Sequence, residues 1–177
     1  MATAMRLTPE VKAALRHRFR GMEETGWVAE LAAQRGWREA NRRYLESMRE
    51  QGVHEMAALM EDLGVSGTVS TEEALELLEA VLAVYLPEAE ARRTTDDEGQ
   101  LALLIAVRDC PTYARIERSG WHGVTACGSW HRRQGWYQAL GVDALDTVVG
   151  EKKWGDIACA ALVQIAGIAS SDEQRRG

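Results

Sequence analysis

Three cysteines are the residues of this chain best suited to chemistry. Cys110 and Cys127 each precede a segment whose pattern predicts a helix, and Cys159 lies in a short apolar run. A helix N-terminus lowers the pKa of a thiol and so favours the reactive thiolate. Because the cysteines are odd in number and widely spaced, they do not indicate a secreted disulfide framework. The pattern therefore predicts a thiol site and a cytoplasmic location.

Histidines and an aspartate close to the cysteines are candidate proton-transfer groups. His131 follows Cys127 by about one helical turn, so the two side chains share one helix face. His122 lies on the preceding loop, and Asp109 adjoins Cys110, where it could orient a histidine. These residues predict a nucleophile, Cys127 or Cys110, assisted by one of the histidines. The alternative is that the cysteines are small buried side chains without chemistry.

Aromatic and basic side chains gather around the second cysteine. Trp121 and Trp130 lie on either side of it, and Tyr137 follows at helical spacing. These rings could line a pocket for a flat or cationic ligand, or they could simply fill the core between a helix and a sheet. Arg132 and Arg133 could clamp a substrate carboxylate, or they could form a solvated helix face.

Hydrophobic periodicity predicts the elements that must position these residues. Residues 8–86 form a helical block, and a sheet and pocket region follows over residues 88–166. We expect one α+β domain over residues 1–169, with residues 170–177 as a flexible tail. Its N-terminal helices pack on a four-stranded, mainly antiparallel sheet made of two hairpins.

Local signals refine this prediction. Ser70 and Glu73 have the spacing of a capping box that opens a helix. The second strand, residues 100–108, is almost continuously apolar and is expected to be buried on both faces. A helix over about residues 126–140 follows the second cysteine. The pocket should therefore lie between the sheet and this helix.

Charge and length exclude several classes of partner. The 177 residues carry a net charge of −6 and a pI near 5.3, and no dense Lys/Arg cluster offers a basic face. Nucleic acid and anionic membrane surfaces are therefore not expected as partners. The longest apolar run, residues 101–107, is far shorter than the roughly 20 residues that cross a bilayer. The expected partner is a small-molecule substrate or ligand, with a homodimer as the candidate assembly.

The cysteine motifs carry a family resemblance. Asp109-Cys110-Pro111 stands at the end of a buried strand, Cys127 precedes a helix, and the run from Gly155-Asp156 to Cys159 is a Gly-Asp-x-x-Cys turn. In these motifs the chain resembles the L-2-amino-thiazoline-4-carboxylic acid hydrolase-like family. It is also similar in layout to the 4-vinyl reductase-type ligand-binding domains. The resemblance covers roughly residues 88–166.

The resemblance implies a site and also shows departures. Relatives among the 4-vinyl reductase-type domains hold zinc with cysteines placed like Cys127 and Cys159, and Glu151 would complete such a site here. Zinc is therefore the one cofactor to consider. The hydrolase-like family usually has Asp where this chain has Trp130, and Asp-Phe follows its last cysteine where Ala160 and Ala161 stand here.

The resemblance and the residues together predict a hydrolase-like enzyme of secondary metabolism. It would cleave a carbon–nitrogen or carbon–sulfur bond in a small amidine- or thiazoline-type compound with its cysteine/histidine site. The alternative is a non-catalytic ligand-binding or sensor domain with an aromatic-lined pocket, which would contain zinc if the metal ligands above are correct.

Overall fold

The structure of the chain is a computed structural model that describes residues 7–19, 26–67, 69–96, 99–118 and 127–168. His122, Trp121 and the predicted tail over residues 170–177 lie outside these ranges. In chain order the elements are α1 (Pro9–Phe19), α2 (Gly26–Arg35), α3 (Trp37–Leu63), α4 (Thr71–Tyr85), β1 (Ala89–Thr95), β2 (Leu101–Val107), α5 (Pro111–Arg118), α6 (Ser129–Leu140), β3 (Val142–Gly150), the 3₁₀ turn η2 (Lys152–Trp154) and β4 (Cys159–Ile168).

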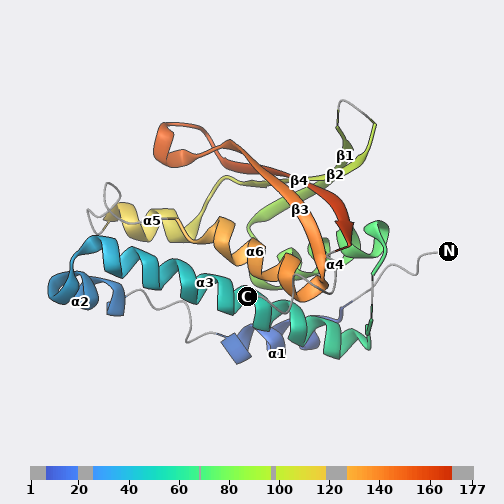
Figure 1. The fold of residues 1–177 in the computed structure, drawn as a ribbon, viewed down its shortest axis with the longest axis horizontal. Helices are drawn as coiled ribbons and strands as arrows, with labels where there is room; N and C mark the ends of the chain where they lie inside the picture. The colour runs from blue at the N-terminus through green and yellow to red at the C-terminus, as the bar shows by residue number, and fades with distance from the viewer. Residues whose placement is uncertain (1–6, 20–25, 68, 97–98, 119–126, 169–177) are drawn as a thin grey trace.

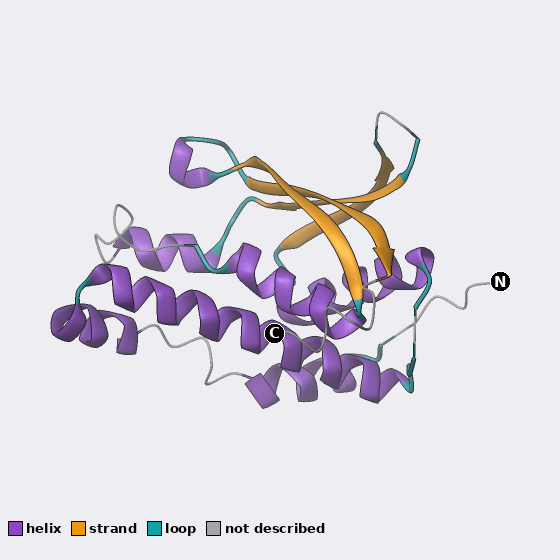
Figure 2. Cartoon of the chain, in the orientation of Figure 1, coloured by secondary structure: helices purple, strands orange, loops and turns teal. Residues whose placement is uncertain are grey.

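The four strands form one antiparallel sheet in the order β1-β2-β4-β3. Two hairpins, β1–β2 and β3–β4, join because β4 pairs with β2, which places Cys159 opposite Val107 and Ala161 opposite Ile105. Figures 1 and 2 show the helices gathered on one side of this sheet. The predicted α+β fold, with helices packed on a four-stranded antiparallel sheet of two hairpins, is confirmed.

Local chemistry explains where several helices begin and end. The capping box at α4 is present: Glu73 N donates to Ser70 Oγ at 3.3 Å, and Ser70 N donates to the Glu73 carboxylate at 2.8 Å. Pro9 occupies the first position of α1, where a missing N–H costs nothing. Gly64 ends α3 in the left-handed conformation with φ 66°.

The helical layer is built on a close backbone contact between α3 and α6. A Cβ atom on Gly52 would lie 2.0 Å from the carbonyl oxygen of Arg132, and one on Gly135 would lie 2.1 Å from the carbonyl oxygen of Arg49. Two glycines therefore let the helix backbones touch. The core lies between this layer and the sheet, with Trp136 and Leu103 fully buried within it.

The two faces of the sheet differ in cover. On the face toward the helices, Leu103 and Ile105 of β2 are buried. On the opposite face, Ala102 is fully buried, Leu104 and Ala106 are partly buried, and no described helix covers this face of the sheet (Figure 1). The expectation that β2 is buried on both faces therefore holds at Ala102 and only in part at the other two positions of this face. Within that part, none of the helices has both the length and the apolar character needed to span a bilayer.

Candidate functional site

A cavity of about 130 Å³ lies between the sheet and the helices α3, α4 and α6, where the sequence predicts a pocket. Its walls are mostly apolar, and all three cysteines of the chain contribute to them. The lining residues are Tyr44, Met48, Leu82, Leu86, Ile105, Val107, Cys110, Cys127, Ser129, Trp130, Arg132, Arg133, Val148, Gly150, Glu151, Cys159, Ala160 and Ala161. The fold thus brings together thiols that lie far apart in the sequence.

Cys110 occupies the N-terminus of α5 as a helix cap. Its Sγ accepts a hydrogen bond from Tyr113 N at 3.4 Å, and its carbonyl oxygen accepts one from Ala114 N at 3.0 Å. The sulfur therefore takes the place that a serine or aspartate oxygen usually has. A cation lies close by, because Lys152 donates to the carbonyl oxygen of Arg108 and its Nζ lies 6.0 Å from the Tyr113 ring. The sulfur therefore lies at the positive end of the α5 dipole.

The other two cysteines lie in different surroundings. Cys127 precedes α6, and its Sγ lies 3.1 Å from Ser129 Oγ. Cys159 begins β4, and burial raises the pKa of its thiol, although the backbone N–H of Lys152 partly opposes the shift. The thiols of Cys110 and Cys127 raise that pKa further. All three cysteines are free thiols.

A buried ion pair lies beside the cavity between α6 and α3. Arg132 donates to both carboxylate oxygens of Glu55, at 2.8 and 2.5 Å, and the two side chains are 6% and 0% exposed. Glu55 also accepts from Trp136 Nε1 at 3.0 Å and from Gln51 Nε2 at 2.7 Å. Four hydrogen bonds therefore compensate the desolvated carboxylate.

A second buried pair joins α6 to β3. Arg133 donates to the two oxygens of Asp146 at 2.7 and 2.9 Å, and Tyr137 Oη donates to Asp146 at 2.8 Å. Burial lowers the pKa of Arg133, but the hydrogen bonds and charge of Asp146 outweigh burial and raise it. Burial and the Asp146 charge both raise the pKa of Tyr137. The two neighbouring arginines thus tie α6 to α3 on one side and to the sheet on the other.

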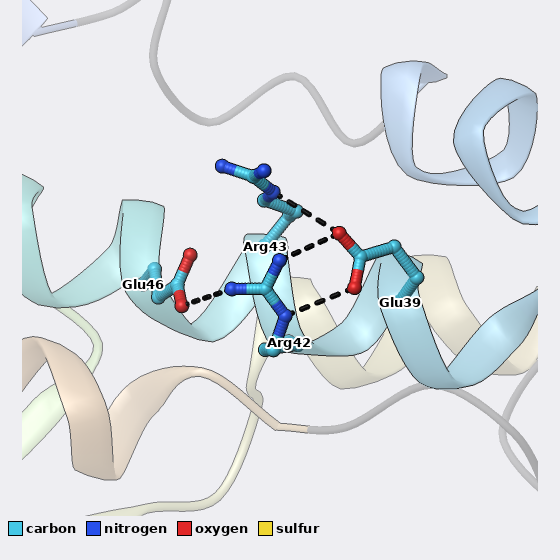
Figure 3. Close-up of polar contacts among 4 residues, drawn as sticks. All are labelled: Glu39, Arg42, Arg43 and Glu46. Atoms are coloured by element: carbon cyan, nitrogen blue, oxygen red, sulfur yellow. Dashed lines mark hydrogen bonds and ion pairs between the residues drawn. The ribbon is translucent and has the colours of Figure 1, made fainter. Parts of the chain in front are cut away.

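An exposed network on α3 provides a contrast to these buried pairs. Figure 3 shows Arg42 between Glu39 and Glu46, with Arg43 also bonded to Glu39. The hydrogen bonds of Arg42 lower the pKa of Glu39 to about 2. Exposed pairs of this kind contribute little to stability because water screens them.

A wider groove of about 470 Å³ lies between α2 and α3. Trp27 and Leu31 line it together with the charged side chains of Arg35, Glu39 and Arg43. Glu39 and Arg43 bond to each other across one wall, and the groove contains no cysteine or histidine. We therefore assign the candidate site to the thiol-lined cavity.

The remaining predicted site residues are only partly brought together. Trp130, Arg132, Arg133 and Glu151 line the cavity with the cysteines, whereas His131 and Asp109 are not among its lining residues. His131 packs edge-on against Trp130 with ring centroids 4.9 Å apart. Burial lowers the pKa of His131, and the charge of Arg49 lowers it further.

The predicted zinc ligands Cys127, Cys159 and Glu151 share the cavity wall. Within the described ranges, however, no group of three or more His, Cys, Asp or Glu side chains is placed to hold a metal ion. The donor set therefore does not fit zinc in this arrangement, and we assign no metal chemistry to the site.

Comparison with known proteins finds similarity at the level of the fold. No family model matches the chain, and no curated protein matches it in sequence. Among solved structures, the fold is similar to trafficking protein particle complex subunit 3 from Naegleria fowleri, covalently bound to palmitic acid. The TM-score is 0.52 with 10% sequence identity, over 87% of this chain and 99% of that chain.

This comparison corrects the function predicted from the sequence. The predictions of a hydrolase-like enzyme and of a role in secondary metabolism are wrong, because the similar structure is a subunit of a trafficking complex and not a hydrolase. The prediction of a small-molecule substrate or ligand as the sole partner is wrong for the same reason, since that subunit belongs to a multi-protein complex. At 10% identity the likeness itself concerns the fold.

Proposed function

We propose that this chain is a non-enzymatic adaptor subunit of a protein assembly and that its thiol-lined cavity holds an acyl chain. The observation that carries the proposal is the cavity itself, which combines apolar walls from the sheet, α3 and α4 with three free thiols. The similar fold of a trafficking complex subunit with covalently bound palmitic acid supports both parts of the proposal.

The cavity in the structure is too small to hold a long acyl chain without rearrangement. Its volume of about 130 Å³ is below the roughly 300–1,000 Å³ of common ligand pockets, so a long acyl chain must displace wall side chains. Met48 is unbranched and changes rotamer easily, and Trp130 is 40% exposed. Both side chains line the cavity, so their rotation would widen it without unfolding the layer behind them.

Cys110 is the thiol best prepared to carry the chain as a thioester. Its sulfur accepts a backbone N–H and caps a helix, whereas burial raises the pKa of Cys159 and so lowers the thiolate fraction of that thiol. The thiolate would attack the carbonyl carbon of an acyl thioester such as palmitoyl-coenzyme A. The new carbon–sulfur bond replaces the old one, the donor leaves as a thiol, and no oxidant or reductant is needed.

Intact-protein mass spectrometry tests this proposal. The purified chain is incubated with palmitoyl-coenzyme A, and one palmitoyl adduct that neutral hydroxylamine removes is expected. Cys110→Ser should lose the adduct, while the matched variant Cys159→Ser should keep it. An adduct that persists in Cys110→Ser but disappears in Cys127→Ser would move the attachment to the second cysteine. The absence of any adduct, together with no binding of a fluorescent fatty acid, would overturn the acyl-chain function.

Two further statements belong to the same proposal. Three free thiols favour a reducing compartment, so we place the protein in the cytoplasm. We also propose that the chain shares an origin with the hydrolase-like family on its cysteine motifs, without sharing hydrolysis. A solved structure of a family member would test that relation. Cysteines that superpose on Cys110, Cys127 and Cys159 would support a common origin, and an unrelated fold would refute it.

A further inference from the structure

The sheet has one face that no described element covers. On this outer face, β2 carries Ala102, Leu104 and Ala106, and β4 carries Ala160, Leu162 and Gln164. At one end of the face, Gln164 bonds to Asp96 opposite the fully buried Ala102, and the other positions are apolar. Antiparallel strands with one wet face usually alternate apolar and polar residues, whereas strands that are apolar on both faces are typical of sheets with cover on both sides. The two central strands therefore have the sequence of a sheet with a second cover.

We propose that the outer face of the sheet is a docking surface for a single amphipathic helix of a partner protein. The side of that helix above β1 carries acidic residues. This inference rests on the adaptor part of the proposed function and names the kind of partner, and the residues that test it, Arg92, Leu104 and Leu162, are not among those that line the thiol-lined cavity.

The area of the face favours one helix over a large partner. Four strands about 4.8 Å apart and about 24 Å long give a face of roughly 450 Å². A stable interface between two globular proteins buries about 800 Å² on each partner, which this face alone does not reach. A helix of about 16 residues is 24 Å long and spans the face from end to end.

The outer face has large and small side chains in successive rows, and this shape also suits a helix. Across the central strands, Leu104 pairs with Leu162, and Ala106 pairs with Ala160 in the next outward row. Two sheets that stack face to face lie about 10 Å apart, and large side chains are needed to fill the gap between them. If a second copy of the chain packed its leucines against these leucines, the alanines of the two copies would face each other and leave a void. The leucine or isoleucine side chains of a helix reach into the depression above the alanines.

Charge at the two edges of the face sets the polarity of the partner. Arg92 of β1 stands beside Leu104 in the same outward row, is exposed, and makes no ion pair with any residue in the described ranges. Its neighbour Glu90 has its own partner, Arg108, at 3.9 Å. At the opposite edge, β3 carries the apolar Leu145, which is 57% exposed, next to the uncharged Thr147 opposite Leu162. The docked helix is therefore acidic on one flank and apolar on the other.

The test uses two synthetic peptides of about 16 residues that form amphipathic helices. Both have the same leucine stripe, and they differ in carrying either Glu or Lys along one flank. Fluorescence anisotropy measures their affinities, and backbone amide shifts locate the binding site. We expect the Glu-flanked peptide to bind at Leu104 and Leu162. Arg92→Glu should weaken its binding about tenfold and strengthen binding of the Lys-flanked peptide by a similar factor.

Controls separate this inference from the proposed function. Arg38→Glu makes the same charge change on the exposed side of α3 and should leave both affinities unchanged. Leu145→Asp, at a position already exposed, should weaken both peptides. The inference is overturned if neither peptide saturates, if amide shifts map to the cavity, or if Arg92→Glu affects the two peptides alike. Self-association that Leu145→Asp abolishes would also overturn it in favour of a second copy. None of these results alters the palmitoyl adduct at the cavity.

Discussion

At the scale of single residues, Glu55 has the most consequential environment in the molecule. Its carboxylate is fully buried and accepts hydrogen bonds from Arg132, Trp136 and Gln51. Glu55→Gln removes the carboxylate charge that this network sets against the Arg132 guanidinium, so we expect a loss of about 3–5 kcal/mol in the free energy of unfolding. Urea denaturation measures the loss.

Two further variants show whether the buried charge is the cause. Glu39→Gln disrupts the exposed network of Figure 3 and should leave the unfolding midpoint unchanged, because water screens those ion pairs. The double variant Glu55→Gln/Arg132→Met removes both charges and should be more stable than Glu55→Gln alone. Equal losses in Glu55→Gln and Glu39→Gln would refute this account.

The three thiols should differ in their reactivity with pH. Because burial raises the pKa of Cys159, its thiolate fraction at any given pH is smaller in the native protein than in urea, and its alkylation in the native protein should begin at higher pH. Iodoacetamide labelling from pH 6 to 10, followed by peptide mass spectrometry, gives the three profiles. In urea the profiles should coincide. A native protein in which Cys159 reacts first would contradict the assigned environments.

At the scale of elements, the contact between α3 and α6 sets the geometry of the cavity wall. Gly52→Ala places a methyl group on the carbonyl oxygen of Arg132, and overpacking of this kind costs about 1–3 kcal/mol or more. Gly26→Ala is the matched control, because nothing lies within 4 Å of the added atom and the substitution should be neutral or slightly stabilising. The thermal unfolding midpoints of the two variants test this prediction. Similar midpoints would mean that α3 and α6 move apart enough to accommodate the methyl group.

The helices and strands were predicted from the sequence more accurately than the site was. The Ser70–Glu73 capping box, the proline at the start of α1 and the paired strands follow from local chemistry, and the structure contains them. The pairing of β4 with β2 depends on contacts between distant segments, which no local pattern encodes.

Sequence reasoning found less of the site than of the fold. It singled out the cysteines, which the fold brings to one cavity, and it named Arg132 and Arg133 without their partners. It missed Glu55 and Asp146, because a charged residue within a helix or strand usually faces water and no spacing rule marks one that faces the core. A signal was present in retrospect, since Gln51 and Glu55 interrupt the apolar face of α3.

At the scale of the whole molecule, binding of an acyl chain should stabilise the native state. A ligand at one hundred times its dissociation constant adds about 2.7 kcal/mol to the free energy of unfolding. We expect sodium palmitate to raise the urea midpoint of the chain accordingly. Ala161→Phe fills the cavity from β4 and should abolish the increase, whatever its own baseline stability. An equal increase in the variant would place the fatty acid elsewhere.

The glycine contact between α3 and α6 has a consequence for kinetics. Helices whose backbones already touch at Gly52 and Gly135 cannot slide past each other without a collision of carbonyl groups. The backbone of this wall therefore keeps its shape while a ligand enters or leaves, and opening falls to rotation of side chains such as Met48 and Trp130 and to the edge of the sheet, where Val148 at the cavity is 42% exposed. The residence time of a bound chain is then governed by these local motions, and hydrogen exchange should be faster at the edge strand β3 than in α6.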